Sequence, residues 1–286
     1  MAKIPWDEAC EFDPTLLALG RVFDVIPPNV ETLTGGLTNR CWKVHTHDGQ
    51  EFIWRPVTSL TRKLAISRQQ EYLILGALQK NACYFSPKPI SRQPEGILVE
   101  WLSGEPVKTV QEMDLVRLLH DIHHQDLFHS PVSQFNYTAR VDHYWLTLES
   151  NNIDLSRYKD LYNKLRVAPS VIALKPTLCH LDLGKHNLIR NQKGLCAIDW
   201  EYSTLADPRL DLAMTLSMED FDVVSFVARY CQLAGYINID NWIDGVQAWM
   251  PRVNLMALLW YLVAYHHGCG EEYLSSAEEI FNRLQE

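Results

Sequence analysis

The sequence lacks the features that mark a membrane protein or a disulfide-stabilised one. No stretch is apolar over the about 20 residues that a membrane-spanning helix requires. Residues 1–14, MAKIPWDEACEFDP, carry acids and a proline where a signal peptide needs an apolar core. The seven cysteines are an odd number and include no CxxC pair, so they predict neither a disulfide framework nor a zinc ribbon. We therefore expect a cytoplasmic protein with reduced cysteines and no membrane partner.

Positive charge is also scarce. The chain has 26 Lys and Arg residues against 35 Asp and Glu residues, which gives a formal net charge of -9. Because no run of Lys or Arg forms a basic patch, a nucleic-acid partner is disfavoured, whereas a small cationic substrate would suit this field. The 47% hydrophobic and 21% charged residues are typical of a folded protein. A chain of 286 residues can form one large domain or two lobes that share a cleft.

The order of the local patterns favours two lobes. Short runs of strand-forming residues separated by turn residues fill 30–55 and predict an antiparallel sheet. An apolar run at 97–102 then leads into Ser103-Gly104-Glu105-Pro106, which we interpret as a linker. Helical spacing dominates the remainder. We therefore predict an α+β protein with a small antiparallel β-sheet lobe at residues 1–102 and a larger, mainly helical lobe at residues 103–286.

The spacing of apolar residues also places individual elements. Asp13 followed by Pro14 predicts the start of a short helix over 15–23. Further helices are predicted at 61–80, 110–124, 140–149 and 155–167, and short strands at 177–179 and 195–198, before four more helical stretches.

The segment PTLCHLDLGKHNLIRNQKGLCAIDWEY, residues 176–202, is the most informative in the chain. It places Asp182, Asn187 and Asp199 next to short apolar runs. A hairpin between strands 188–190 and 195–198 would bring Asn187 and Asp199 alongside each other. Carboxylate and carboxamide oxygens at such a position suit a divalent cation, and they favour Mg²⁺ over a softer metal.

Phosphoryl transfer requires this kind of residue set. The protein needs a metal to bridge phosphate oxygens, a carboxylate to accept the proton of the attacking hydroxyl, and cations to offset the departing charge. Asp182, Asn187 and Asp199 can supply the first two. A single aspartate in such a segment is more often a turn or cap residue, but the complete set in this order favours the catalytic interpretation.

The pattern HxDxxxxN followed by a hydrophobic residue and Asp-Trp-Glu resembles the catalytic segment of the aminoglycoside phosphotransferase and choline kinase superfamily, closest to bacterial thiamine kinases and choline/ethanolamine kinases. The resemblance implies a bilobal protein-kinase-like fold that binds ATP and Mg²⁺ between its lobes. It implies that Asp182 is the catalytic base, that Asn187 and Asp199 hold Mg²⁺, and that His180 is a scaffold residue. In the DPxxDLA element of the same family, Asp211 would accept amide hydrogens from the catalytic loop.

Further parts of the expected nucleotide site lie in the first lobe. The wording GGLTN resembles the nucleotide loop of choline kinases and implies ATP contacts from Gly35, Gly36, Leu37, Thr38 and Asn39, although the third glycine of protein kinases is missing. Arg55 stands where kinases have a phosphate-binding lysine, and Glu71 stands where its helical partner is expected; a surface arginine at a strand end is the alternative. Backbone groups near Glu100 and Leu102 match the hinge that faces adenine.

The acceptor site is the least determined by the sequence. The stretch NLMALLWYLVAYHHG, residues 254–268, places Trp260 on one helical stripe and Tyr261 and Tyr265 on the adjacent face, which suits cation–π contact with a cationic alcohol. Such a stripe is more often core. Tyr202 and Asp142 are further candidates for substrate binding.

These observations predict an ATP-dependent kinase that phosphorylates the hydroxyl of a small cationic alcohol. The C-terminal half and the GEPVK motif resemble thiamine kinases and favour thiamine as the acceptor, whereas the GGLTN motif resembles choline kinases and favours choline or ethanolamine. An aminoglycoside is a third acceptor, but the last helices show no dense acidic cluster. A catalytically silent nucleotide-binding regulator would show damage at the base or metal positions, and the sequence has none. A protein kinase would need a longer activation segment than the one between Asp199 and Asp207. The oligomeric state is left open.

Overall fold

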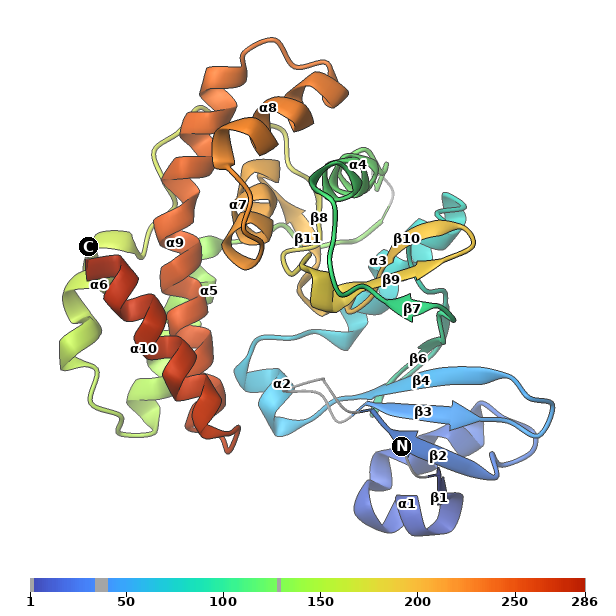
Figure 1. The fold of residues 1–286 in the computed structure, drawn as a ribbon. Helices are drawn as coiled ribbons and strands as arrows, with labels where there is room; N and C mark the ends of the chain where they lie inside the picture. Colours follow the sequence, from blue (N-terminus) through green and yellow to red (C-terminus); the bar gives the residue numbers. More distant parts are fainter. Residues whose placement is uncertain (1–2, 34–40, 128–129, 286) are drawn as a thin grey trace.

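An antiparallel sheet forms the first part of the chain in the computed structural model, which describes residues 3–33, 41–127 and 130–285. In spatial order, the six described strands are β1 (Lys3–Pro5), β2 (Asn29–Thr32), β3 (Trp42–His45), β4 (Glu51–Pro56), β6 (Gly96–Glu100) and β5 (Pro89–Gln93). All neighbouring pairs are antiparallel, as the run of strand and turn signals predicts. The sheet lies apart from most of the helices (Figure 1).

Alternation along β4 and β6 divides the side chains between two cores. Trp54 and Leu98 face one side and pack with α1 (Trp6–Phe12) and the 3₁₀ helix η1 (Pro14–Arg21). Ile53 and Val99 face the other side, toward α3 (Arg68–Lys80) and the main core of the molecule. Arg55 shares the face of Ile53, because side chains two apart along a strand point the same way. The sheet therefore directs Arg55 inward, toward the second part of the chain.

Three predicted helices differ from the structure, and the one expected at 155–167 begins as the 3₁₀ helix η2 (Ser156–Tyr158) and continues as α6 (Lys159–Leu165). The single helix expected at 61–80 is divided into α2 (Ser59–Lys63) and α3, because Ala65 adopts a left-handed conformation with φ 56° and the Ser67 side chain caps a new helix by accepting from Gln70 N. The helix expected at 15–23 is the 3₁₀ helix η1, whose start Asp13 caps by accepting from Thr15 N. Helix existence was predictable here, but helix type and continuity were not.

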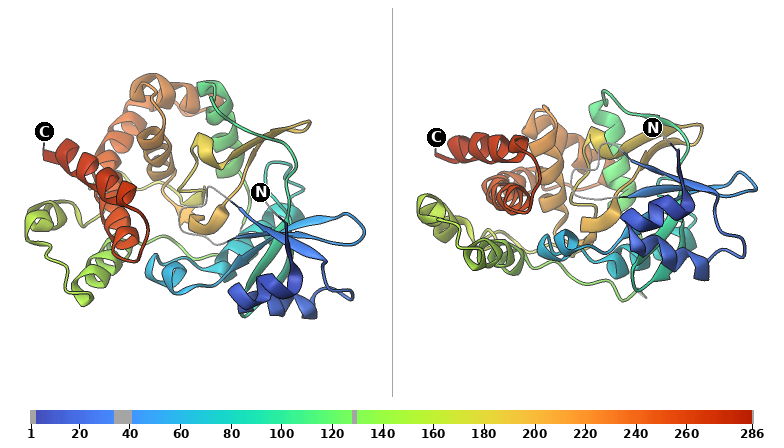
Figure 2. Two further views of the ribbon diagram at one scale, coloured as in Figure 1. Left: turned by 60° about the horizontal axis from the view of Figure 1, so that its bottom comes forward. Right: turned by 90° about the horizontal axis from the view of Figure 1, so that it is seen from below.

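Helices make up most of the remaining chain. They are α4 (Glu112–His123), α5 (Tyr137–Ser150), η2 (Ser156–Tyr158), α6 (Lys159–Leu165), α7 (Pro208–Met218), α8 (Val223–Ala234), α9 (Ile239–Tyr265) and α10 (Glu271–Gln285). The long helix α9 packs against α5, α7, α8 and α10 and so forms the spine of this part. The other views show the same separation of sheet and helices (Figure 2). The α+β architecture is the one that the sequence predicts.

Two small sheets lie between the large sheet and the helices. Strand β8 (Thr177–Cys179) pairs with β11 (Thr204–Ala206), and β9 (Leu188–Asn191) pairs with β10 (Gly194–Ala197) and with β7 (Glu105–Pro106). The predicted hairpin is thus β9–β10. Since β7 pairs with this hairpin rather than with the first sheet, we propose to keep the lobe boundary at residues 102 and 103.

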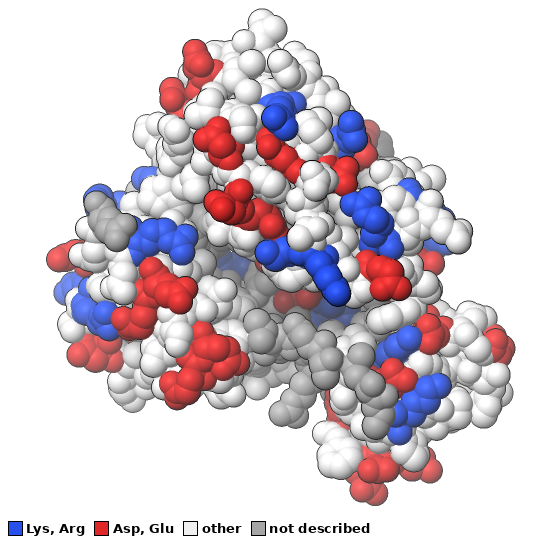
Figure 3. Space-filling view, viewed as in Figure 1, with Lys and Arg blue, Asp and Glu red and all other residues white. Residues whose placement is uncertain are grey.

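The surface is mixed in charge. Lys and Arg side chains are scattered among Asp and Glu on the face seen in Figure 3. No helix within the described ranges combines the length and the apolar character that crossing a membrane requires.

Candidate active site

The turn after β8 brings Asp182 and Asn187 together. The 3₁₀ helix η3 (Lys185–Asn187) turns the chain back, and the Asn187 amide nitrogen donates to both the backbone oxygen and the carboxylate Oδ2 of Asp182, each at 2.9 Å. The backbone oxygen of Asn187 accepts from Ile198 N at 2.9 Å, so the hairpin places Asp199 beside Asn187. The three residues predicted from spacing therefore lie at one site.

Left-handed backbone conformations mark both turns of this site. Leu181 has φ 60° and Asp199 has φ 64°, and neither is glycine. Such a conformation costs about 1–3 kcal/mol and persists only where surrounding contacts impose it. The backbone N–H of Leu181 is held by Asp211 Oδ1 at 2.7 Å. The contacts of Asp211 thus offset strain next to Asp182.

Asp211 is fully buried on α7 and holds the backbone of the turn that follows β8. Its carboxylate accepts from His180 N at 2.8 Å as well as from Leu181 N, and His123 Nε2 lies 3.0 Å from Oδ2. Burial alone would raise the pKa of Asp211, but the hydrogen bonds from His123 and from the loop hold it below its usual value. The carboxylate of Asp211 therefore stays ionised. It accepts backbone N–H groups, as the resemblance of the DPxxDLA element implies.

His180 holds the loop from its other side. Its ring is fully buried, Nε2 donates to Ile198 O at 3.1 Å, and it packs edge-on against Trp200 with ring centroids 4.8 Å apart. Burial lowers the pKa of His180, so the ring is neutral. A neutral, enclosed ring suits a scaffold and cannot reach an acceptor hydroxyl.

A buried ionic cluster joins the first sheet to the turn at Asp199. The Arg55 guanidinium contacts the Asp199 carboxylate through one terminal nitrogen, which also donates to Glu201 Oε2 at 2.9 Å. Arg55 Nε lies 2.8 Å from Glu71 Oε1, an ion pair. Burial raises and Arg55 lowers the pKa of Asp199, with a net decrease. The buried arginine of the structure thus excludes the surface-arginine alternative.

Sequence reasoning missed two members of this cluster, Arg68 and Glu201. Arg68 NH1 donates to Glu71 Oε2 at 2.7 Å and to Glu201 Oε2 at 2.8 Å, and all three side chains are buried. Burial, followed by the charge of Asp199, raises the pKa of Glu201 to about 7. Two signals were available: Glu201 completes the Asp-Trp-Glu string, and Arg68 stands three residues before Glu71 on one helix face.

The expected nucleotide loop, Gly35, Gly36, Leu37, Thr38 and Asn39, lies outside the described residues. At the hinge, the backbone N–H of Glu100 donates to Lys88 O at 2.9 Å, so it is committed to the sheet and not free for adenine. The backbone N–H of Leu102 has no hydrogen-bond partner in the described part of the chain. Leu102 therefore remains the better candidate of the two.

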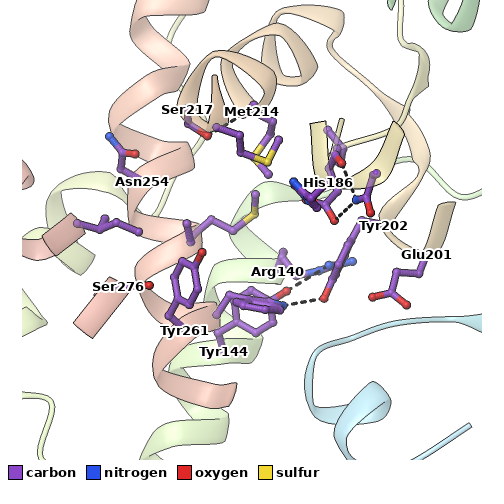
Figure 4. A pocket seen from close by; sticks show the side chains of 18 of the residues that line it. Arg140, Tyr144, His186, Glu201, Tyr202, Met214, Ser217, Asn254, Tyr261 and Ser276 are labelled. Carbon is purple, nitrogen blue, oxygen red and sulfur yellow. Dashed lines mark hydrogen bonds and ion pairs between the residues drawn. The ribbon is translucent and has the colours of Figure 1, made fainter. Parts of the chain in front are cut away.

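A cavity of about 490 Å³ opens at Asp182 and extends between the helices. Tyr202, Trp260 and Tyr261 line it together with Asp182, and the Trp260 indole N–H donates to the Tyr202 hydroxyl at 2.7 Å (Figure 4). The wall residues missed from the sequence include Arg140 on α5, which carries a charge into this space. Aromatic side chains and Asp182 therefore share one cavity.

Two predicted substrate residues lie elsewhere. Asp142 follows Arg140 by two residues on α5 and so points away from the cavity, where it accepts from Tyr162 OH at 2.8 Å and from Arg166 NH2 at 2.5 Å. Tyr265 stands one turn beyond Tyr261, and its hydroxyl donates to Glu271 at 3.3 Å. Neither side chain lines the cavity.

His186 lies next to the expected base. Its Nε2 is 3.5 Å from Asp182 Oδ1, and this contact raises the pKa of His186. The histidine was not singled out from the sequence because its position depends on the turn of η3.

The oxygen atoms at the centre fit a magnesium ion. The Asn187 amide nitrogen is used by Asp182, which leaves its Oδ1 as a donor, and Asp199 adds a carboxylate. Such hard oxygen donors are the ligands that Mg²⁺ prefers.

Comparison with known proteins agrees with this geometry. A family model described as phosphotransferase enzyme family (APH) matches residues 29–245, which include the catalytic segment and the ionic cluster. The chain belongs to the phosphotransferase enzyme family. It is therefore an enzyme that transfers a phosphoryl group to an alcohol.

Relatives of this phosphotransferase span nearly its whole length. A thiamine kinase from Escherichia coli is 26% identical over 269 residues, which cover 93% of each chain. Among solved structures, an ethanolamine kinase from Plasmodium vivax has a TM-score of 0.73 at 16% identity and covers 96% of this chain and 87% of its own. The choline kinase LicA from Streptococcus pneumoniae, also solved in complex with AMP, has a TM-score of 0.65 at 20% identity and covers 93% of this chain.

These similarities confirm the predicted superfamily and the bilobal protein-kinase-like fold. The matched range ends at residue 245, so the part of α9 that carries Trp260 and all of α10 lie beyond it. The identity of the acceptor is therefore a separate question from the identity of the family.

Proposed function

We propose that this phosphotransferase is an ATP-dependent kinase that phosphorylates the hydroxyl of a small cationic alcohol, with thiamine as the favoured acceptor. The observation that carries the proposal is one cavity in which Asp182 meets the aromatic side chains of Tyr202, Trp260 and Tyr261. An alcohol held by these rings would bring its hydroxyl to the carboxylate. The use of ATP also favours the cytoplasm as its location.

Each residue of the centre has a proposed role in the transfer. Asp182 accepts the proton of the attacking hydroxyl, and the Asn187 amide fixes the Asp182 carboxylate through its hydrogen bond to Oδ2. Asn187 Oδ1 and Asp199 would hold Mg²⁺, which would offset the charge of the phosphates. Arg55, positioned by Glu71, supplies a fixed cation for the nucleotide phosphates.

The aromatic walls of the cavity support a cationic acceptor. Of the four acids that line it, Asp199 and Glu201 are paired with arginines of the ionic cluster, and Asp182 and Glu279 remain, against Arg140 and Arg283. Aromatic faces attract cations most strongly when water is excluded. The E. coli relatives named thiamine kinases align with 93% of this chain, which favours thiamine.

Choline or ethanolamine is the alternative acceptor, favoured by the similarity of fold over nearly the whole chain to kinases named for these alcohols. An aminoglycoside is less favoured, because Glu279 is the one carboxylate that the described residues of α9 and α10 contribute to the cavity. A polyamine would need several.

The test is an acceptor panel with ATP and Mg²⁺, comprising thiamine, choline, ethanolamine and an aminoglycoside. We expect turnover of thiamine, and we expect Asp182→Asn to lower kcat by about 10²- to 10⁴-fold while ATP still binds, since a positioned base contributes about that much. Asp142→Asn is the matched control, because Asp142 lies outside the cavity, and its turnover should equal that of the wild type. Wild-type inactivity on every alcohol would refute the substrate class, and full activity of Asp182→Asn would refute the base.

A further inference from the structure

Arg140 is a cation inside the cavity that the transfer chemistry does not use. It rises from α5 between aromatic rings, and its guanidinium lies 5.5 Å from the ring centroid of Phe135, 5.9 Å from that of Tyr144 and 5.8 Å from that of Tyr202. All four residues line the same cavity as Asp182, and Figure 4 shows Arg140, Tyr144 and Tyr202 among them.

The guanidinium of Arg140 has no acidic partner among the residues that the structure describes. Its one hydrogen bond to a described residue runs from NH1 to the neutral hydroxyl of Tyr144 at 3.3 Å, and no carboxylate in the described ranges lies within ion-pair distance. Arg55, in contrast, is ion-paired with three carboxylates. A guanidinium has five N–H donors, so Arg140 keeps most of its donors for a ligand.

Neighbouring hydroxyl groups add to this excess of donors. Tyr144 OH donates to Leu64 O at 3.2 Å and accepts from Arg140, so it is satisfied. Tyr202 OH accepts from Trp260 Nε1, and its own proton has no acceptor among the described residues. The end of the cavity at Arg140 and Tyr202 therefore has N–H and O–H donors that lack acceptors among the described residues. A ligand that binds there should supply hydrogen-bond acceptors.

The same end is unfavourable for a positive charge. A cation placed beside Arg140 would be repelled, and the rings of Tyr144 and Tyr202 already face a guanidinium. A cationic alcohol must therefore direct its charge elsewhere in the cavity and must present an uncharged or negative acceptor group to Arg140. Choline and ethanolamine have no acceptor group apart from the reacting hydroxyl.

We propose that Arg140, together with the Tyr202 hydroxyl, binds an acceptor nitrogen of a heteroaromatic ring on the substrate. The inference rests on the proposed function and narrows the acceptor to a cationic alcohol that also carries a nitrogen heteroaromatic ring, the class to which thiamine belongs. Arg140 then selects against choline and ethanolamine, and Asp182 acts on any alcohol that reaches it.

A double comparison of enzyme and substrate tests this assignment. The substrates are thiamine and an N-methylated hydroxyethyl-thiazolium, which keeps the cation and the hydroxyl but lacks the pyrimidine ring. We expect wild-type KM to be about tenfold or more higher for the fragment, because hydrogen bonds to a charged donor contribute about that much. In Arg140→Met we expect KM for thiamine to rise by about the same factor, with no further rise for the fragment and kcat changed less than KM.

The matched control is Arg157→Met. Arg157 also contacts two aromatic rings, those of Tyr158 and Phe281, but lies on the exposed surface, so its loss should leave both KM values unchanged. Thermal melting verifies folding. If Arg140→Met does not fold, Arg140→Gln replaces it, and the wild-type comparison of the two substrates stands by itself.

Two results with these substrates would overturn the inference and leave the proposed function intact: equal wild-type KM values for thiamine and the fragment, or a folded Arg140→Met variant with the wild-type KM for thiamine. Efficient wild-type turnover of choline, unaffected at Arg140→Met, would do the same. Absence of turnover with every cationic alcohol would instead refute the proposed function and the inference with it.

Discussion

At the scale of single residues, the site depends on charges that are buried together. Arg55 and Arg68 form ion pairs with the carboxylates of Glu71, Asp199 and Glu201. In each of these pairs at least one side chain is buried. Two guanidinium groups cannot neutralise three ionised acids. Burial, and next the charge of Asp199, raises the pKa of Glu201 to about 7, which identifies Glu201 as the acid that holds a proton.

This raised pKa predicts a specific pH dependence of stability. Between the unfolded pKa, about 4.5, and about 7, the folded protein holds a proton on Glu201 that the unfolded chain has released. The free energy of unfolding should therefore fall as pH rises from 5 to 8, by about 2.5 kcal/mol at about 1.4 kcal/mol per pKa unit. Urea unfolding of the wild type and of Glu201→Gln at both pH values measures this decrease. The glutamine variant should lack the part of the decrease that arises from Glu201. Parallel pH profiles for the two proteins would contradict the assignment.

The sequence predicted some residues of the site correctly and missed others. Asp182, Asn187 and Asp199 could be found because their spacing is fixed by one local hairpin. Arg68, Glu201 and Arg140 could not, because their roles arise from contacts between segments far apart in the chain, such as the Arg68–Glu201 pair at a separation of 133 residues. Asp142 was misplaced because helical phase decides which side chains of α5 face the cavity.

At the scale of elements, α7 positions the catalytic loop. Its N-terminus is capped by Asp207, which accepts from Arg209 N, and its first turn presents Asp211 to the backbone of His180 and Leu181. One carboxylate thus satisfies two backbone donors where the chain takes a strained turn. The DPxxDLA wording predicts this element, whereas the break between α2 and α3 depends on the left-handed Ala65, for which the sequence gives no local signal.

Asp211→Asn tests this support. An amide has one acceptor oxygen in place of two, so a buried backbone donor loses its partner, at a cost of about 1–3 kcal/mol in the free energy of unfolding. Loss of the constraint on Leu181 should also lower kcat more than the affinity for ATP. Denaturant unfolding and steady-state kinetics give the two values.

Asp222→Asn provides the comparison at a helix start. Asp222 caps α8 through Ser225 N at an exposed position, where asparagine is an equally good cap, so stability and activity should not change. Equal effects at positions 211 and 222 would refute the special role of Asp211.

At the scale of the whole molecule, the ionic cluster joins the two lobes. Arg55 and Glu71 belong to the sheet and to α3, and Asp199 and Glu201 belong to the turn that follows β10. The nucleotide site is proposed to lie at this junction. Ligand binding and lobe association should therefore be coupled through the same carboxylates.

We expect a non-hydrolysable ATP analogue with Mg²⁺ to raise the melting temperature, since a ligand at 100 times its Kd stabilises the folded state by about 2.7 kcal/mol. Asp199→Asn should lose most of the increment that depends on Mg²⁺ and keep the shift produced by the nucleotide alone. Thermal shift with and without Mg²⁺ separates the two. An undiminished Mg²⁺-dependent shift in the variant would show that Asp199 is not a ligand.

Residues of α10 line the cavity on the proposed acceptor side, far along the chain from the residues proposed to bind the nucleotide. Glu279, Ile280 and Arg283 line the cavity together with Trp260 and Tyr261, whereas Arg55 and Glu71, proposed to serve the nucleotide, precede them by about two hundred positions. We therefore expect an exchange of α10 to alter the part of the acceptor wall that it contributes, whereas the wall residues Arg140 on α5 and Tyr202, and the residues proposed for phosphoryl transfer, would be kept.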